Sequence, residues 1–116
     1  MENKVKDQIV TENYAIYNSD CMLVMPTLAD ESVDLSVYSP PFAGLYNYSS
    51  SENDFSNCEN KEQFLEQYEY LVKEISRVTK AGRITAVHAT DVFDNTCRLW
   101  DFPHEIIRIH EKYGFE

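Results

Sequence analysis

Residues 33 to 42 read Val33-Asp34-Leu35-Ser36-Val37-Tyr38-Ser39-Pro40-Pro41-Phe42, and this stretch gives the clearest indication of the fold. From Val33 to Tyr38, apolar or β-branched side chains alternate with smaller or polar ones, which predicts a strand. The next four residues combine a short polar side chain, two rigid prolines and an aromatic ring. Because open α/β sheets bind ligands at the carboxyl ends of their strands, the pattern predicts a site for a flat ring that bears an amine.

The segment before this strand predicts a short strand and a short helix. Tyr14 to Asn18 is rich in β-prone residues, and Asp20 is placed to cap a turn of helix that runs to Met25. Thr27 to Glu31 is an expected loop. After the strand, residues 43–60 are rich in Ser, Asn, Asp and Tyr, which indicates a long surface loop.

The second half of the chain predicts two longer helices around another strand. Apolar residues recur at helical spacing from Lys61 to Thr79, and Gly82 is the expected helix stop. Ile84 to His88 predicts a buried strand, and residues 88–101 an irregular connection. Pro103 to Tyr113 predicts the last helix. The alternation of strands and helices predicts one α/β domain, residues 1–116, with a parallel sheet and flanking helices.

Composition narrows the class of protein. Ten basic and twenty acidic residues give a net charge of -10, the wrong sign for a surface that neutralises phosphates. No apolar run has the length of a membrane span, and the amino terminus lacks the apolar stretch of a signal peptide. Three cysteines are an odd number for a disulfide framework and form no Cys-x-x-Cys, so we expect reduced thiols, a cytoplasmic location and no metal; they are Cys21, Cys58 and Cys97.

The tetrapeptide after the strand suits chemistry on an exocyclic amine. Such an amine is a poor nucleophile because its lone pair is delocalised into the ring, so a site must hold its hydrogens with acceptors. The Ser39 hydroxyl and the Pro40 carbonyl are suitable acceptors, and the fixed φ of Pro40 and Pro41 holds the backbone rigidly. Phe42 offers a face on which a flipped base stacks. A stiff turn after a strand is the alternative interpretation.

Four segments in order resemble the amino-terminal part of the DNA amino-methyltransferases, the N-4/N-6 methylase family. They are Asn18-Ser19-Asp20-Cys21, Leu28-Ala29-Asp30-Glu31-Ser32-Val33-Asp34-Leu35, Ser39-Pro40-Pro41-Phe42 and Glu74-Ile75-Ser76-Arg77-Val78-Thr79-Lys80-Ala81-Gly82-Arg83. Residues 101–115 also look like a late helix of phage-type and mobile-element members. The resemblance implies a partial Rossmann-like fold that binds S-adenosylmethionine. It assigns Ser39, Pro40, Pro41 and Phe42 to catalysis, and Asp20 and Cys21 to the cofactor.

The resemblance also implies that the family's glycine-rich cofactor loop and target-recognition region are absent from the chain. Its three glycines, Gly44, Gly82 and Gly114, form no Gly-x-Gly. We therefore expect an amino-terminal catalytic part, inactive alone, of an enzyme that acts on double-stranded DNA in restriction-modification. The missing strands predict a gap in the sheet or unpaired edges, and hence a displaced amino-terminal strand or a homo-oligomer.

Several alternatives stay open at the level of sequence. Serine at the first motif position favours cytosine N4 over adenine N6 as the target, but both occur with serine in the family. An amine in RNA or in a protein glutamine also fits the motif. Asp20 is equally suited to plain helix capping, and His88 to a structural role. Finally, the chain is interpretable as a non-catalytic α/β module that self-associates.

Overall fold

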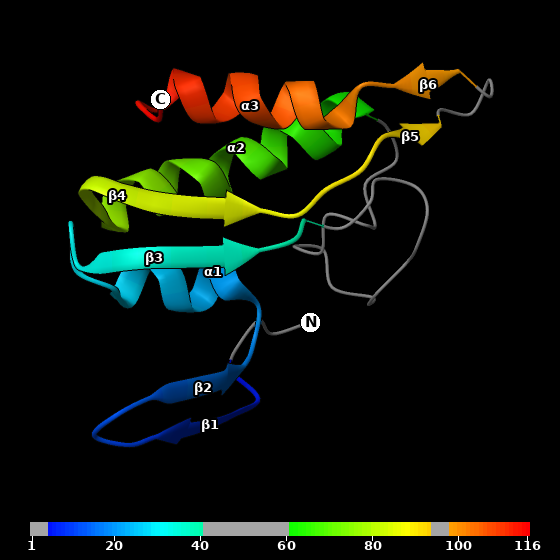
Figure 1. Cartoon of the computed structure of the whole chain (residues 1–116). Helices are drawn as coiled ribbons and strands as arrows, with labels where there is room; N and C mark the ends of the chain where they lie inside the picture. Colours follow the sequence, from blue (N-terminus) through cyan, green and yellow to red (C-terminus); the bar gives the residue numbers. More distant parts are fainter. Residues whose placement is uncertain (1–4, 41–60, 94–97) are drawn as a thin grey trace.

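The computed structural model describes residues 5–40, 61–93 and 98–116. At its centre two parallel strands, β3 (Val33–Tyr38) and β4 (Thr79–Val87), lie side by side, connected through helix α2 (Lys61–Val78) (Figure 1). Helix α3 (Phe102–Lys112) follows and packs beside α2. The predicted parallel α/β arrangement is confirmed for these elements, and β3 has the predicted bounds.

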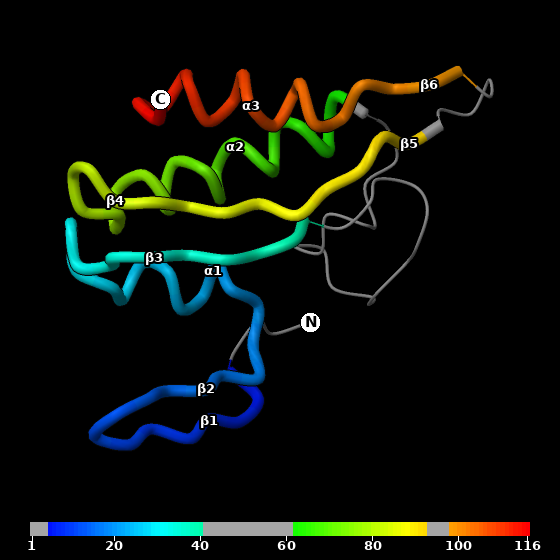
Figure 2. Tube along the Cα trace, viewed as in Figure 1, coloured from blue at the N-terminus to red at the C-terminus, as the bar shows by residue number. Residues whose placement is uncertain are grey.

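The amino-terminal part forms a separate hairpin. Strands β1 (Asp7–Val10) and β2 (Ala15–Asn18) pair antiparallel, with Ile9 opposite Ile16. Within the described residues β2 is not hydrogen-bonded to β3, so the expected gap between these two strands is present. The trace in Figure 2 shows the hairpin set apart from the central pair. The sequence prediction missed β1, the partner that β2 has here.

Asp20 begins the connection from the hairpin to the sheet. Its carboxylate caps helix α1 (Cys21–Val24), which continues into a 3-10 turn, η1 (Met25–Thr27). Pro26 lies in the first positions of that turn, where its missing N–H costs nothing. The predicted cap and short helix are therefore confirmed, and α1 leads the chain back towards β3.

The prediction that Gly82 stops the long helix is wrong. Helix α2 ends at Val78 and β4 begins at Thr79 with no linker, so Gly82 lies inside the strand at φ 77°. Val33 pairs with Thr79, whereas Leu35 already pairs with Ile84. The extra residues of β4 are absorbed between these pairs, and glycine permits the left-handed backbone there.

Residues 88–101 are also more regular than predicted. They contain two short antiparallel strands, β5 (Val92–Phe93) and β6 (Leu99–Trp100). Helix α3 then starts one residue before the predicted Pro103, capped by Asp101, and Gly114 follows its end at φ 97°. The predicted loop of residues 43–60, with Tyr46 and Tyr48, lies outside the described residues.

The core lies between the helices and one face of the sheet. Phe64, Tyr68 and Val72 of α2 are at most 1% exposed, and Phe102 of α3 is fully buried. Each such side chain stabilises the fold by roughly 1.5–3 kcal/mol through removal from water. Trp100 joins this cluster from β6, with its ring edge-on to Phe64.

Arg77 ties the last turn of α2 to the segment before β3. Its guanidinium donates to the carbonyls of Met25 and Leu28 at 2.9 and 2.8 Å and pairs with Asp30 and Glu74. The planar group presents several donors at once, which suits this fork of acceptors. The contacts fix where β3 begins relative to α2.

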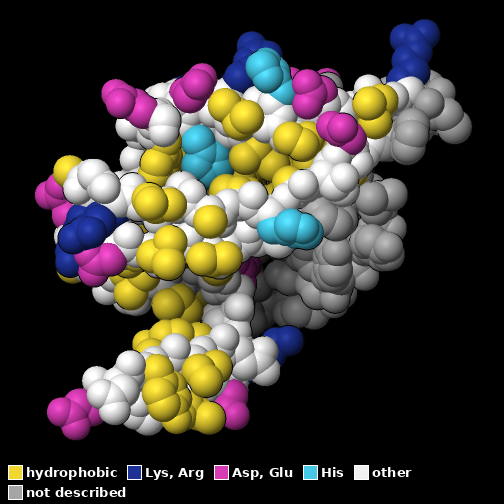
Figure 3. All heavy atoms as spheres, viewed as in Figure 1, with side chains coloured by type: hydrophobic (Ala, Val, Ile, Leu, Met, Phe, Trp, Pro, Cys, Tyr) yellow, Lys and Arg dark blue, Asp and Glu magenta, His cyan; other side chains and the backbone are white. Residues whose placement is uncertain are grey.

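The opposite face of the β3–β4 pair is open. Leu35, Val37 and Ile84 are 60%, 73% and 66% exposed. Figure 3 shows hydrophobic side chains gathered over the two strands on the face turned to the viewer. We call these three residues the open sheet face.

Candidate active site at the ends of two strands

Ser39 lies where the sequence prediction places it, directly after β3. The residue is exposed, and its hydroxyl donates a hydrogen bond to the backbone carbonyl of His88, 2.9 Å away, just beyond β4. The His88 N–H donates in turn to the Tyr38 carbonyl at 3.0 Å. The carboxyl ends of the two parallel strands are thus joined at the edge where such sheets bind ligands.

This geometry makes the Ser39 oxygen an acceptor. Its single hydrogen has the His88 carbonyl as the nearer acceptor, at 2.9 Å against 3.5 Å for the Pro40 carbonyl, while the two lone pairs of the oxygen remain for an N–H donor. An exposed, oriented acceptor at a strand end is what the predicted amine chemistry requires. Pro40 is buried beside it, and Pro41 and Phe42 lie outside the described residues.

Asp20 has one oxygen in the cap and one without a partner. Oδ1 accepts from the Met22 N–H at 2.8 Å, whereas Oδ2 is buried and finds no hydrogen-bond donor among the described residues. A buried carboxylate oxygen is costly to leave unpaired. Helix capping therefore uses only Oδ1, and Oδ2 fits a hydroxyl or amine of a bound cofactor.

Cys21 follows at the start of α1 as a free cysteine. Although the residue is exposed, desolvation of the thiol and the neighbouring Asp20 carboxylate raise its pKa. The thiol is therefore protonated at neutral pH and is a poor nucleophile. Burial is the main cause of the raised pKa of Tyr38, and Cys21 is a smaller one. The start of α1 therefore lies close to the end of β3.

A polar cluster that the sequence analysis missed lies under this edge. The hydroxyls of Tyr38 and Tyr68 are 2.6 Å apart, and the Tyr38 hydroxyl is 3.1 Å from Nε2 of His110. His110 Nδ1 is 2.7 Å from the Ile106 carbonyl. A carbonyl only accepts, so Nδ1 carries the hydrogen and, in the neutral ring, Nε2 accepts from Tyr38. Tyr68 then donates to the oxygen of Tyr38.

Burial keeps all three groups of this cluster uncharged at neutral pH. It raises the pKa of Tyr38 to about 12 and raises that of Tyr68 further. It lowers the pKa of His110, against the raising effect of the bond to the Ile106 carbonyl. The sequence signal for the cluster was a histidine on the apolar stripe of α3, four residues after Ile106.

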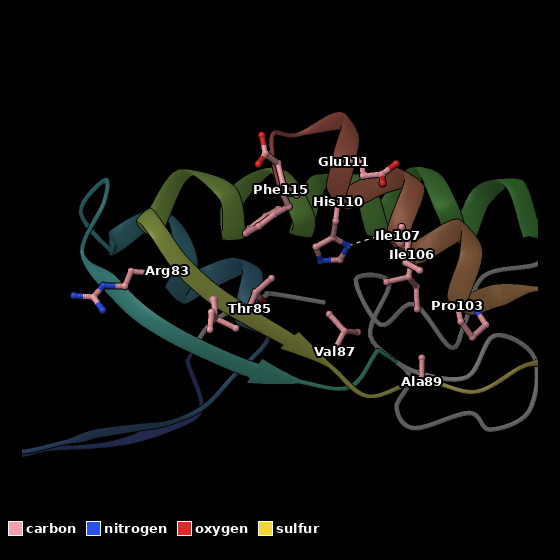
Figure 4. Close-up of a pocket in the computed structure, with 12 residues that line it drawn as sticks. Arg83, Thr85, Val87, Ala89, Pro103, Ile106, Ile107, His110, Glu111 and Phe115 are labelled. Carbon is pink, nitrogen blue, oxygen red and sulfur yellow. Dashed lines mark hydrogen bonds between the residues drawn. The ribbon is translucent and has the colours of Figure 1, made fainter.

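A cavity of about 410 Å³ opens between β4 and α3. Thr85, Val87 and Ala89 line its β4 side, and Ile106, His110 and Phe115 line the other (Figure 4). Neither Ser39 nor Asp20 lines it. The described residues of the predicted site, Asp20, Cys21, Ser39 and Pro40, therefore lie outside the lining of this cavity.

No group of three His, Cys, Asp or Glu side chains is arranged to hold a metal ion in the described ranges. Within the same residues, no helix has the length and apolarity needed to cross a membrane.

Comparison with solved structures places this architecture. The chain matches the crystal structure of TTHA0409 from Thermus thermophilus, a putative DNA modification methylase, in its selenomethionine form, with a TM-score of 0.65 and 23% identity. The form complexed with S-adenosyl-L-methionine matches with a TM-score of 0.64 and 22% identity. The chain shares the fold of part of this protein.

The matches extend over 84% of this chain, but over only 37% and 39% of the two TTHA0409 chains. The chain therefore spans less than two-fifths of these solved structures. No protein-family model and no curated protein matches the sequence. The predicted α/β fold, with a parallel pair of strands and flanking helices, is confirmed, and the chain matches only part of its structural neighbours.

Proposed function

We propose that the chain is the amino-terminal catalytic part of an S-adenosylmethionine-dependent methyltransferase that acts on an exocyclic amine in DNA, cytosine N4 or adenine N6. One observation carries the proposal. An oriented acceptor, the Ser39 oxygen, lies at the carboxyl edge of a sheet whose fold matches part of TTHA0409, a putative DNA modification methylase. The resemblance of Ser39 to Phe42 to the family motif supports the same conclusion.

The residues of the chain have distinct roles in this proposal. The Ser39 oxygen accepts one amine hydrogen and the Pro40 carbonyl the other, which localises the nitrogen lone pair. Pro41 and Phe42 complete the motif, with Phe42 as the stacking surface for a flipped base. These acceptors bind and orient the amine but remove no proton by themselves.

The unpaired Oδ2 of Asp20 supports a cofactor at the start of α1. S-adenosylmethionine, when bound, supplies an electrophilic methyl group. Asp20 would hold it through Oδ2, and Cys21, protonated, would contact it without reacting. TTHA0409 has been crystallised with this cofactor, and it shares the fold.

Double-stranded DNA is the proposed partner of the larger enzyme. Because the chain has a net charge of -10, the proposal requires that the grip on phosphates come from polypeptide outside it. A self-associating, non-catalytic module is the second candidate function. The open sheet face of Leu35, Val37 and Ile84 favours it, since monomers rarely leave such faces uncovered.

The decisive experiment is methyl transfer from labelled cofactor. We would incubate the longest natural polypeptide that carries this sequence with unmethylated DNA, RNA and a glutamine-containing protein, and digest the products for mass spectrometry. N4-methylcytosine or N6-methyladenine from DNA supports the proposal and identifies the base. Label in RNA or protein alone, or in none of them, overturns it.

A further inference from the structure

Tyr38 is held at both of its ends immediately before the candidate catalytic residues. Its backbone carbonyl accepts from His88, whose own carbonyl accepts from Ser39. Its side chain lies on the face of the sheet that the helices cover, where the hydroxyl contacts Tyr68 of α2 and His110 of α3. A displacement of the Tyr38 ring is therefore transmitted to the backbone from which Ser39 projects.

The partners of this hydroxyl come from both long helices. Tyr68 of α2 is fully buried and His110 of α3 is 7% exposed. Apolar residues flank them, among them Ile106 and Phe115, whose ring centroid is 5.4 Å from that of His110, although His110 also lines the cavity between β4 and α3. In such surroundings an unpaired hydroxyl is costly, so the hydrogen-bonded arrangement is strongly favoured over its alternatives.

We propose that Tyr68 and His110 are positioning residues that act through Tyr38 to hold Ser39 and Pro40 in the arrangement needed for methyl transfer. This inference rests on the proposed function and deepens it. Packing alone would be served equally by phenylalanine at each position. Three polar groups in one directed chain, from Tyr68 to Tyr38 to His110, instead specify the position of the Tyr38 hydroxyl.

The test separates the hydrogen bonds from the packing. Tyr68→Phe and His110→Phe keep an aromatic ring but remove a hydrogen bond to the Tyr38 hydroxyl. His110→Gln retains an acceptor that reaches the place of Nε2. Tyr70→Phe is the matched control, since Tyr70 lies on the same helix as Tyr68 but is 62% exposed. None of these substitutions touches Ser39, Pro40 or Asp20.

Two measurements are made on each variant. Nuclear magnetic resonance of the isolated chain follows the signals of Ser39 and His88. Steady-state methyl transfer by the longest natural polypeptide gives kcat and the KM for the cofactor. We expect both phenylalanine variants to shift the Ser39 and His88 signals and to lower kcat about 10- to 100-fold, with KM within about twofold, because small misplacements of reacting groups cost rates of this order. His110→Gln should restore most of kcat, and Tyr70→Phe should match the wild type.

The outcomes distinguish this inference from the function on which it rests. Unchanged Ser39 and His88 signals in both phenylalanine variants overturn the positioning role, whatever the activity. A kcat equal to the wild type in those variants overturns it as well. If the wild-type polypeptide transfers no methyl group while the signals still shift, the proposed function fails. The hydrogen bonds of Tyr68 and His110 then fix the geometry of the strand ends but have no role in methyl transfer.

Discussion

The hydroxyl of Ser39 donates to the carbonyl of His88 at 2.9 Å, although the two residues are 49 positions apart in the sequence. The bond joins the ends of two parallel strands and turns the lone pairs of a serine outward. Serine hydroxyls rotate freely in solution, so this contact is what orients the acceptor. It follows that the orientation of the Ser39 oxygen depends on the residue after β4 as well as on the motif after β3.

We expect Ser39→Ala to lower methyl transfer by the longest natural polypeptide about 10- to 1,000-fold and to leave cofactor affinity nearly unchanged. The reason is the loss of one oriented polar contact to the reacting amine. Single-turnover assays measure the effect. Ser36→Ala is the matched control, because the Ser36 hydroxyl also joins β3 to β4, through Thr85 at 2.6 Å, but away from the strand ends. Transfer by Ser39→Ala at the wild-type rate would remove Ser39 from the mechanism.

Asp20→Asn separates the two roles of this carboxylate. The amide oxygen still caps α1, whereas the amide nitrogen replaces Oδ2 with a donor. We expect unfolding in urea to change little and cofactor affinity in calorimetry to fall by about 1.5–3 kcal/mol, as for a lost bond to a charged group. Asp101→Asn, at the cap of α3, is the control and should leave affinity unchanged. An Asp20→Asn protein that binds the cofactor normally would reduce Asp20 to a cap.

Periodicity in the sequence predicted the elements that carry the site, because the regular spacing of apolar residues in long amphipathic segments is recognisable in the sequence. Helix α3 begins one residue before the predicted Pro103, and β3 begins and ends as predicted. The error at Gly82 arose because a helix that passes directly into a strand has no linker to mark the boundary. Strands as short as β5 have too few residues to show a period.

The contacts that orient the candidate site were beyond a reading of local pattern. Tyr38 meets Tyr68 and His110 across 30 and 72 residues of sequence, and the sequence analysis gave none of the three side chains a polar partner. Tertiary proximity alone shows that their polar atoms converge. In the same way, the family resemblance suggested a cofactor role for Asp20, but only the structure shows that its Oδ2 is buried with no donor among the described residues.

The stability of the chain should fall between neutral and mildly acidic pH through His110. Burial lowers the pKa of its imidazole in the folded state, so the unfolded state binds a proton first as the pH falls. The contribution of neutral His110 to the free energy of unfolding is complete above the pKa of the unfolded state, near 6.5. It is lost as the pH falls from there towards the pKa of the folded state. One such group changes the unfolding free energy by at most about 1.4 kcal/mol per pH unit.

Urea unfolding at pH 7.5 and 5.5 measures this linkage. The difference in unfolding free energy between the two pH values should shrink in His110→Gln, which has no titrating ring. His104→Gln, on an exposed position of the same helix, should retain the wild-type difference. Equal pH dependence in His110→Gln and the wild type would show that His110 is not the group responsible.

The isolated chain should show no measurable DNA binding at physiological salt. Ten basic against twenty acidic residues repel phosphates over the molecule as a whole. Fluorescence anisotropy with a labelled duplex tests this, and a lower salt concentration reveals any weak local attraction. A salt-sensitive dissociation constant tighter than about micromolar would contradict the expectation. Arg98→Ala and Arg108→Ala would then test whether these exposed cations supply the grip.

The isolated chain should self-associate through the open sheet face. Leu35, Val37 and Ile84 form an exposed apolar surface on two strands, and covering it with a second copy removes that surface from water. Sedimentation equilibrium should therefore give a mass above the monomer.

Val37→Lys should shift the chain towards the monomer without unfolding it, because this side chain is 73% exposed. Ile16→Lys, at a position 58% exposed in the β1–β2 hairpin, is the control and should associate like the wild type. A wild-type chain that sediments as a compact monomer would contradict the prediction, and association that Val37→Lys leaves intact would assign the interface to another surface.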